Sequence, residues 1–233
     1  MNILAIDTST EACSAALLCD DGQVFSEYAV APRQHTKLLP QMMNAVLKAA
    51  KLPKTAITHC AFANGPGAFT GIRIAASTAQ GIAIGLDIPL VPISTLAVLA
   101  QACLDKYALP DSLVALDARM GEVYWAVYKK DDTGLVFLEG EEKLNKIDEV
   151  SVHAMPACGA GHGWLVGRDI WFKNFIRDKH IQIDTAILPD SEALLKLAKQ
   201  AIDGRKIVSA DNVPINYLRN KVAEKSKKTP LGK

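Results

Sequence analysis

The order of hydrophobic and polar positions along the chain predicts a mixed α/β protein. Apolar residues at helical spacing alternate with short apolar runs of strand length, and glycine, proline and aspartate separate them. After three N-terminal strands, the predicted elements are helix 37–51, strand 57–63, helix 71–86, strand 89–92, helix 95–104, helix 145–150 and helix 191–203. The last helix ends before Gly204, a residue favoured just after a helix.

The pattern of the first strands occurs twice. Residues 4–22 and residues 114–134 each predict a strand that ends in an aspartate, a turn, a second strand, and an acidic turn that contains glycine. Asp7 corresponds to Asp117 in this repeat. Each unit continues into a third strand through a hairpin of the kind that Asp and Gly favour. The sequence therefore predicts two lobes, each of type βββαβαβα.

Two such lobes resemble the actin-like (ASKHA) superfamily, an α/β fold with a duplicated ribonuclease-H-like unit that encloses a nucleotide. We expect the lobes to cover residues 1–106 and 107–233. The resemblance makes the first hairpin a possible vestigial nucleotide site, in which an aspartate would hold hydrated Mg²⁺. Its candidate residues are Asp7, Thr8 and Ser9. Because no glycine lies between Asp7 and Ser14 to admit a phosphate, the alternative is that Asp7 caps the hairpin.

Composition favours a globular protein of the cytoplasm. The chain has 233 residues, of which 49% are hydrophobic, so it can bury a sizeable core. The N-terminus lacks the pattern of a secretory signal, and the five cysteines form no CxxC pair, which favours a reducing compartment. Residues 55–104 carry only two formal charges, but polar residues and glycine interrupt every window long enough to span a membrane.

The formal net charge of +1 is unevenly distributed. Residues 219–233 contain six Lys or Arg and one Glu, which gives this C-terminal tail a local charge of +5. Such a tail is either a solvated terminus or a contact for the phosphates of a nucleic acid. If it contacts a nucleic acid, we expect its deletion to weaken that binding and to flatten the salt dependence of the binding.

The stretch "ANGPGAFTGIRIAAS", residues 63–77, places three glycines and a proline before a helix. Loops of this kind often bind phosphate through their backbone N–H groups. The alternative is that Gly65, Gly67 and Gly71 shape a tight turn from strand to helix. Because the first hairpin lacks glycine, we favour the tight turn.

Four motifs together resemble the bacterial TsaB (YeaZ) family, and the similarity covers nearly the whole chain. They are "ILAIDTSTEACSAAL", "GPGAFTGIRI", "LDARMGEVYWAVY" and "YLRNKVA". The resemblance implies a subunit of the complex that forms N6-threonylcarbamoyladenosine at position 37 of tRNAs reading ANN codons. The implied partners are the catalytic paralogue TsaD, the ATPase TsaE, a second copy of the chain in isolation, and tRNA through the complex, with no membrane.

The resemblance also implies that this subunit has no catalytic residue and no metal. TsaD carries an HxxxH metal pair on a helix, and the two positions fall here on Thr95 and Leu99. The five histidines of the chain are scattered without helical spacing. No cofactor is expected, apart from ATP or ADP at the interface of the complex. The alternative function is an enzyme of the actin-like superfamily that binds and hydrolyses ATP.

Two helices of the N-terminal lobe are the candidate partner surface. Helix 71–86 has one charged residue, Arg73, and is otherwise apolar or small on nearly every side. Helix 37–51 has one apolar face that suits the core and a second apolar edge beside that face. The family uses this lobe for pairing with itself or with TsaD. The expected interface residues are Leu38, Gln41, Met42, Ala45, Ala49, Arg73, Ser77 and Gln80. The alternative is a single wide core face.

Overall fold

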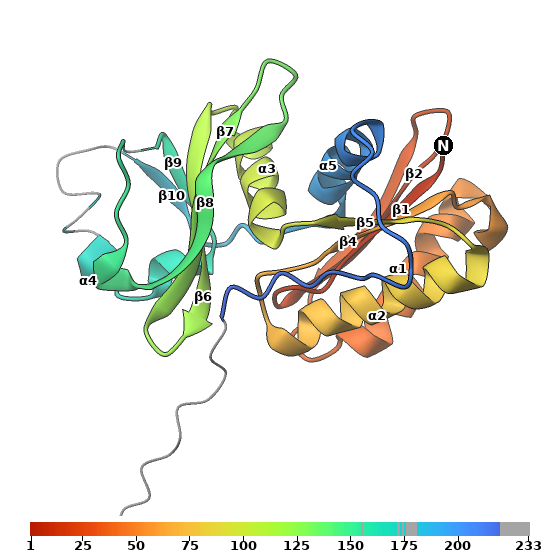
Figure 1. Cartoon of the computed structure of the whole chain (residues 1–233), viewed down its shortest axis with the longest axis horizontal. Coiled ribbons are helices and arrows are strands. Elements are labelled where there is room, and N and C mark those ends of the chain that lie inside the picture. The colour runs from red at the N-terminus through yellow and green to blue at the C-terminus, as the bar shows by residue number, and fades with distance from the viewer. Residues whose placement is uncertain (155, 172, 174, 176–180, 220–233) are drawn as a thin grey trace, which may run out of the picture.

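The computed structural model describes residues 1–219 except 155, 172, 174 and 176–180. Two five-stranded sheets form two lobes (Figure 1). The first sheet has the order β3-β2-β1-β4-β5 and comprises β1 (Ile3–Asp7), β2 (Ala12–Leu18), β3 (Val24–Val30), β4 (His59–Ala63) and β5 (Leu90–Ile93). The second has the order β8-β7-β6-β9-β10 and comprises β6 (Asp111–Arg119), β7 (Glu122–Lys130), β8 (Val136–Lys146), β9 (Cys158–Ala160) and β10 (Gln182–Asp184).

Helices connect and cover these strands. The α-helices are α1 (His35–Ala50), α2 (Phe69–Leu86), α3 (Thr95–Tyr107), α4 (Arg168–Trp171) and α5 (Ser191–Asp203). Single 3-10 turns are η1 (Lys54–Ala56), η2 (Ile147–Glu149) and η3 (His162–Leu165). Among the described residues, no helix combines the length and the apolar character needed to cross a bilayer.

The two sheets repeat one topology. In each, the first three strands are antiparallel neighbours, the fourth strand pairs in parallel with the first, and the fifth pairs in parallel with the fourth. The turn after the first strand is also repeated, because Ser9 N–H donates to Asp7 Oδ1 at 2.7 Å and Arg119 N–H donates to Asp117 Oδ1 at 2.7 Å. The prediction of a duplicated, two-lobed α/β fold is confirmed.

One of the two helices predicted for the second lobe is absent at its expected place. The expected helix over residues 145–150 is wrong: β8 continues to Lys146, which pairs with Glu122 of β7, and η2 follows. Pairing along β7 satisfies the backbone groups of residues 145 and 146, and burial of Ile147 fixes the turn after them. The helix 191–203 is confirmed as α5, whose N-terminus is capped by Asp190.

The two lobes exchange their last helices. Helix α3 follows β5 of the first sheet but packs on β6, β7 and β8 of the second. Helix α5 follows β10 of the second sheet but packs on β1 and β2 of the first, so both helices lie between the sheets and touch each other (Figure 1). Helices α1 and α2 cover the other face of the first sheet, and Trp164 and Trp171 cover the other face of the second. The division at residue 106 stays a prediction.

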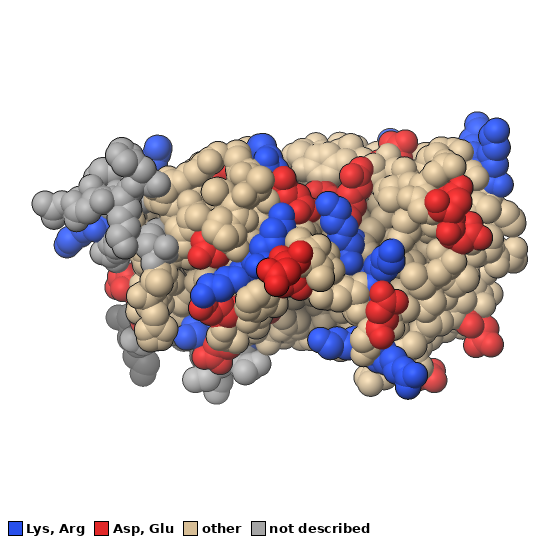
Figure 2. Space-filling view, turned by 90° about the horizontal axis from the view of Figure 1, so that it is seen from above, with Lys and Arg blue, Asp and Glu red and all other residues tan. Residues whose placement is uncertain are grey.

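Charged side chains of both signs are mixed on the face seen from above. Figure 2 shows them gathered near the middle of that face, with red and blue side by side. Asp105 of α3 pairs with Lys130 of β7 at 2.9 Å and with Lys196 of α5 at 2.7 Å, so such pairs join the exchanged helices to the second sheet. Exposed pairs of this kind contribute little stability each.

Candidate functional site: the cleft between the lobes

The glycine-rich loop packs directly on the turn after β1. Ala68 N–H donates to the carbonyl of Ser9 at 2.8 Å, and Thr8 Oγ1 donates to the carbonyl of Gly71 at 2.7 Å. A Cβ atom on Gly67 would lie 2.4 Å from Ser9 O, and one on Gly71 would lie 1.9 Å from Thr8 O. Glycine is therefore required for this contact between two backbones, which leaves no room for an anion between them.

The predicted vestigial nucleotide residues lie together and are buried. Asp7, Thr8 and Ser9 are each at most 2% exposed. Asp7 Oδ2 and Ser9 Oγ have no hydrogen-bond partner among the described residues. Burial raises the pKa of Asp7 to about 6, against the lowering effect of its hydrogen bond with Ser9, and the charge of Asp190 raises it further. Vestigial nucleotide binding by these residues stays a prediction.

A cleft of about 1540 Å³ separates the lobes beyond this turn. The first lobe contributes the turn after β1, the start of α1 and the first turn of α2, and the second contributes the end of β6 and η3. The charged residues that line the cleft are Glu11, Arg33, Arg73, Asp117, Arg119 and Arg219. Its wall also contains residues 216–219, which come from the C-terminal end of the described chain.

A C-terminal strap, residues 205–219, returns from α5 across both lobes (Figure 1). Val208 and Leu90 exchange two backbone hydrogen bonds of 2.9 Å at the edge of the first sheet. Farther along, Asn216 N–H donates to the carbonyl of Asn64 at 2.8 Å. Gly65 has a φ of 105°, and a Cβ atom there would meet Asn216 O at 2.8 Å. The strap therefore covers the glycine-rich loop from the side opposite to the turn after β1.

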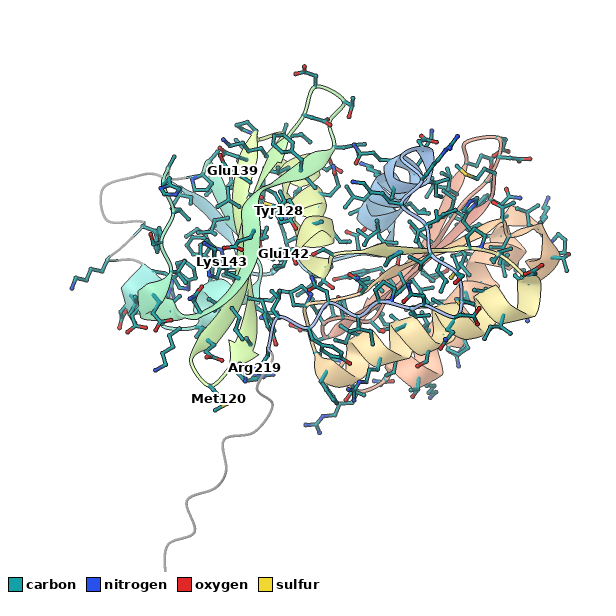
Figure 3. The ribbon with its side chains drawn as sticks, in the orientation of Figure 1. Met120, Tyr128, Glu139, Glu142, Lys143 and Arg219 are labelled. Carbon is teal, nitrogen blue, oxygen red and sulfur yellow. The ribbon has the colours of Figure 1, made fainter. Side chains whose placement is uncertain are left out.

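The Glu142 carboxylate joins the strap to both lobes. It accepts hydrogen bonds from Ser94 Oγ at the start of α3, from Tyr128 OH at 2.7 Å and from Asn216 Nδ2 at 2.7 Å. Figure 3 labels Tyr128 and Glu142 on the neighbouring strands β7 and β8. Burial, then the charge of Glu142, holds the pKa of Tyr128 well above its usual value, so the phenol remains a donor. No signal in the sequence distinguishes Glu142 from its acidic neighbours on β8.

Arg219 anchors the end of the strap on the β6–β7 turn. Its guanidinium donates to Ala118 O at 2.9 Å and forms an ion pair with Glu122. In this turn Arg119 and Met120 have φ values of 67° and 58°, a left-handed conformation that costs free energy for residues other than glycine. The Met120 side chain is 78% exposed, at the lower end of Figure 3. Arg219 therefore makes a contact that closes the lobes; tail residues 220–233 lie outside the described residues.

His162 links the lobes at the cleft, a role that the sequence did not predict. Its Nδ1 accepts from Asp117 N–H at 3.0 Å, and its Nε2 lies 3.7 Å from the carboxylate of Glu11. Burial lowers the pKa of this imidazole below its usual value, although both carboxylates oppose the shift. The only trace in the sequence is the glycine-rich turn "CGAGHG" around it.

His35 lies at the start of α1, and its Nε2 is 3.2 Å from the carbonyl oxygen of Ala12. This contact ties the helix to the start of β2 and gives His35 a structural role.

The expected apolar edge of α1 is only partly free. Met42 is 8% exposed and belongs to the core beneath the first sheet, because its side chain packs with those of α2 and β2. Leu38 and Ala45 are half-buried, whereas Gln41 and Ala49 are exposed. Assignment of Met42 to an outward surface is therefore corrected, and a charge placed there would test the core rather than a contact.

The outer side of α2 contains exposed glycines that the sequence analysis did not single out. Ser77 is exposed as expected, but Gln80 is half-buried and its Nε2 donates to Ala210 O of the strap at 2.8 Å. Gly81 and Gly85 are exposed, and a Cβ atom at either would meet nothing within 4 Å. Ile84 beside them is 66% exposed. The free surface of α2 therefore lies farther toward its C-terminus than predicted.

The two positions that correspond to the histidine pair of TsaD lie in the core. Thr95 and Leu99 lie on α3 with 0% exposure, packed against the second sheet. Among the described residues, no group of three or more His, Cys, Asp or Glu side chains could hold a metal ion.

Comparison with known proteins decides the family. The family model described as "TsaD: tRNA N6-adenosine threonylcarbamoyltransferase" matches residues 29–226. The tRNA threonylcarbamoyladenosine biosynthesis protein TsaB of Escherichia coli K12 is 38% identical, over 97% of each chain. The chain belongs to the TsaB family. The TsaB protein of Haemophilus influenzae is 33% identical, over 97% of this chain and 96% of its own.

A solved TsaB-family structure has the same fold. YeaZ from Pseudomonas aeruginosa superposes with a TM-score of 0.84 at 37% identity, over 93% of this chain and 99% of its own. A second structure from that organism, described as similar to peptidase YeaZ, gives a TM-score of 0.86 at 38% identity, over 94% and 99% of the two chains. The family resemblance read from the four motifs is confirmed.

Proposed function

We propose that this TsaB-family protein is a non-catalytic subunit in the formation of threonylcarbamoyladenosine at position 37 of tRNAs that read ANN codons, and that it pairs with the catalytic paralogue TsaD. The names of its relatives support the pathway. The observation that carries the pairing is the outer side of α2, where two glycines face open space. TsaE, and tRNA held by the complex, are the further partners, in the cytoplasm.

Two features, one in the core and one at the cleft, support a subunit without its own transfer chemistry. The two positions that correspond to the histidine pair of TsaD are a threonine and a leucine inside the core. The glycine-rich loop is occupied by the turn after β1, so its backbone does not offer a phosphate cradle. Both features favour a binding role over ATP hydrolysis by this chain alone, and ATP or ADP would bind where the subunits meet.

The glycines of α2 support close packing of a partner helix. Glycine in the interior of a helix costs about 0.5–1 kcal/mol relative to alanine. Nothing within this chain requires glycine at positions 81 and 85, because a Cβ atom would be unobstructed at both. Together with Ser77 they form a small-residue ridge at i, i+4 and i+8, beside exposed Ile84. On α1, Ala49 and Gln41 extend this surface with Leu38 and Ala45.

One surface cannot serve two partners at once. We therefore propose that a second copy of the chain and TsaD use the same ridge and exclude each other. Arg73 is held by the strap rather than free at the ridge, because its Nε donates to Tyr217 OH at 2.9 Å. It is the weakest member of the predicted interface.

A charge on the ridge is expected to separate pairing from folding. Gly81→Glu or Ala49→Glu would bury an unpaired carboxylate in the contact and weaken binding to TsaD about a hundredfold, or roughly 3 kcal/mol. Calorimetric titration with TsaD measures this, and light scattering measures the homodimer. Thermal unfolding of the isolated chain should not be weakened, because both sites are exposed, and Gly81→Glu should raise the midpoint slightly, since glycine in a helix interior is unfavourable.

Gln200→Glu adds the same charge to an exposed position of α5 and is the matched control. It should leave pairing intact. Retention of both the homodimer and TsaD by the Gly81→Glu and Ala49→Glu variants would exclude this ridge as the interface. Phosphate release from ATP and Mg²⁺ by the purified chain alone would contradict the non-catalytic assignment.

A further inference from the structure

The inter-lobe cleft differs from the rest of the molecule in the type of cation that lines it. Four of the chain's seven arginines border the cleft, whereas none of the lysines that the structure describes does so. Four arginines against two carboxylates leave the lining with a formal charge of +2, or +1 when Glu122, which pairs with Arg219 from outside the lining, is counted. Arginine differs from lysine in its planar, five-donor group, which binds phosphate through two parallel hydrogen bonds and stacks on flat rings.

Arg73 is held between two aromatic rings at the mouth of the cleft. Its guanidinium carbon lies 3.4 Å from the ring centre of Phe69 and 5.7 Å from that of Tyr217. Although Arg73 covers one of its sides, Phe69 is still 50% exposed, and Tyr217 is 42% exposed. Both rings line the cleft, so it offers flat apolar surface next to a fixed cation.

Two further arginines line the cleft from left-handed backbone. Arg33, in the loop between β3 and α1, has a φ of 66°, and Arg119 has a φ of 67°. Within the described part of the chain, no carboxylate lies within 4 Å of the charged groups of Arg33 or Arg73, whereas Arg119 contacts Asp117 at 3.0 Å with 86% of its side chain exposed. The guanidinium groups of Arg33 and Arg73 can therefore bind an anion from outside the chain.

We infer that the rim of this cleft binds a single-stranded segment of RNA, with Arg33 and Arg119 on its phosphates and with bases stacked on Phe69 and Tyr217. Unpaired RNA is recognised by this combination of aromatic faces, guanidinium planes and positive charge. A duplex hides the faces of its bases, so exposed rings favour an unpaired segment. The uncapped N-terminus of α2, at the same mouth, adds positive potential. This inference rests on the proposed function, which makes tRNA the substrate of the complex.

Fluorescence anisotropy with a labelled single-stranded RNA, at several salt concentrations, tests the site on the full-length protein alone and with TsaD. Arg33→Glu should weaken binding at low salt and reduce the slope of log K against log salt by about 0.7. Phe69→Ala should weaken binding about tenfold at every salt concentration, because stacking is not screened. The tail, residues 220–233, is the same in every variant and cannot produce these differences.

The chain offers a matched control for each change. Arg205 is also exposed on left-handed backbone, with a φ of 56°, and Phe137 is also 50% exposed, but neither lines the cleft. Arg205→Glu and Phe137→Ala should bind RNA as the unchanged protein does. The inference is overturned if the cleft variants also do so, if a duplex of the same strand or polyglutamate binds equally well, or if no RNA binds. Because none of these variants lies on the ridge, each should still bind TsaD in a titration. That measurement separates a loss of RNA binding from a loss of pairing.

Discussion

Gly71→Ala is expected to destabilise the protein by several kcal/mol. The new Cβ atom would lie 1.9 Å from Thr8 O and 3.1 Å from Thr8 C, atoms of a backbone that is buried on all sides. A flexible side chain could move away, but here the first turn of α2 or the turn after β1 must shift. Such a shift would also break the 2.7 Å hydrogen bond from Thr8 Oγ1 to Gly71 O. Overpacking costs about 1–3 kcal/mol when side chains can adjust, and more when backbone must move.

Urea unfolding of the purified variant measures this loss as a lower midpoint at an unchanged slope. Gly85→Ala makes the same change on the same helix, where the Cβ atom meets nothing within 4 Å. It should raise the free energy of unfolding by about 0.5–1 kcal/mol, since alanine favours the helix. If Gly71→Ala is as stable as Gly85→Ala, the loop does not pack on the turn after β1 as described.

Asp7→Asn is expected to stabilise the protein above pH 6 by as much as about 3 kcal/mol. The pKa of Asp7 rises from 3.8 to about 6 on folding, so the folded state holds its proton over a range in which the unfolded chain has released it. The protonated Asp7 carboxyl is compatible with burial, so the protein has its full stability below pH 3.8. That stability is lost as pH rises toward 6, because folding must then either bind a proton or bury the charge. A shift of about two units corresponds to about 3 kcal/mol. Asparagine carries no charge and keeps an oxygen that accepts from Ser9 N–H.

Unfolding free energies between pH 4 and pH 8 measure this effect. The variant should lose stability less steeply over this range than the original protein. Part of the slope should remain, because burial also raises the pKa of Asp190. Asp117→Asn makes the same change at the corresponding turn of the second lobe, where the side chain is 23% exposed and pairs with Arg119, and should not stabilise the protein. Parallel pH profiles for the original protein and the Asp7→Asn variant would contradict the buried, unpartnered carboxylate.

The fold could be predicted because its signals are local and occur twice. Alternation in the strands, aspartate at the end of β1 and of β6, and the capping residues of α5 are visible without tertiary information. The second lobe was predicted less well, because its connections are 3-10 turns and short strands that depend on pairing. The end of β8 is an example, since its last residues form a strand only because β7 lies beside them.

The site was harder to predict because it depends on segments far apart in the chain. Met42 has the spacing of an outer edge, but in the structure it lies in the core cluster with residues of α2 and β2. Glu142 and Asn216 are separated by 74 residues, and neither stands out in composition. The glycines of α2 were visible, but only the empty space around a Cβ atom at Gly81 or Gly85 distinguishes an exposed glycine from one required by packing.

The exchange of helices between the lobes sets the order in which the chain can fold as it is synthesised. The first sheet is complete once β5 has been made, but the helix that covers its inner face, α5, ends at residue 203. Until then Ile3, Ala5 and Val91 lack the cover they have in the finished protein. The first lobe therefore reaches its final packing only when nearly the whole chain has left the ribosome, so early folding intermediates expose apolar surface and need protection from aggregation.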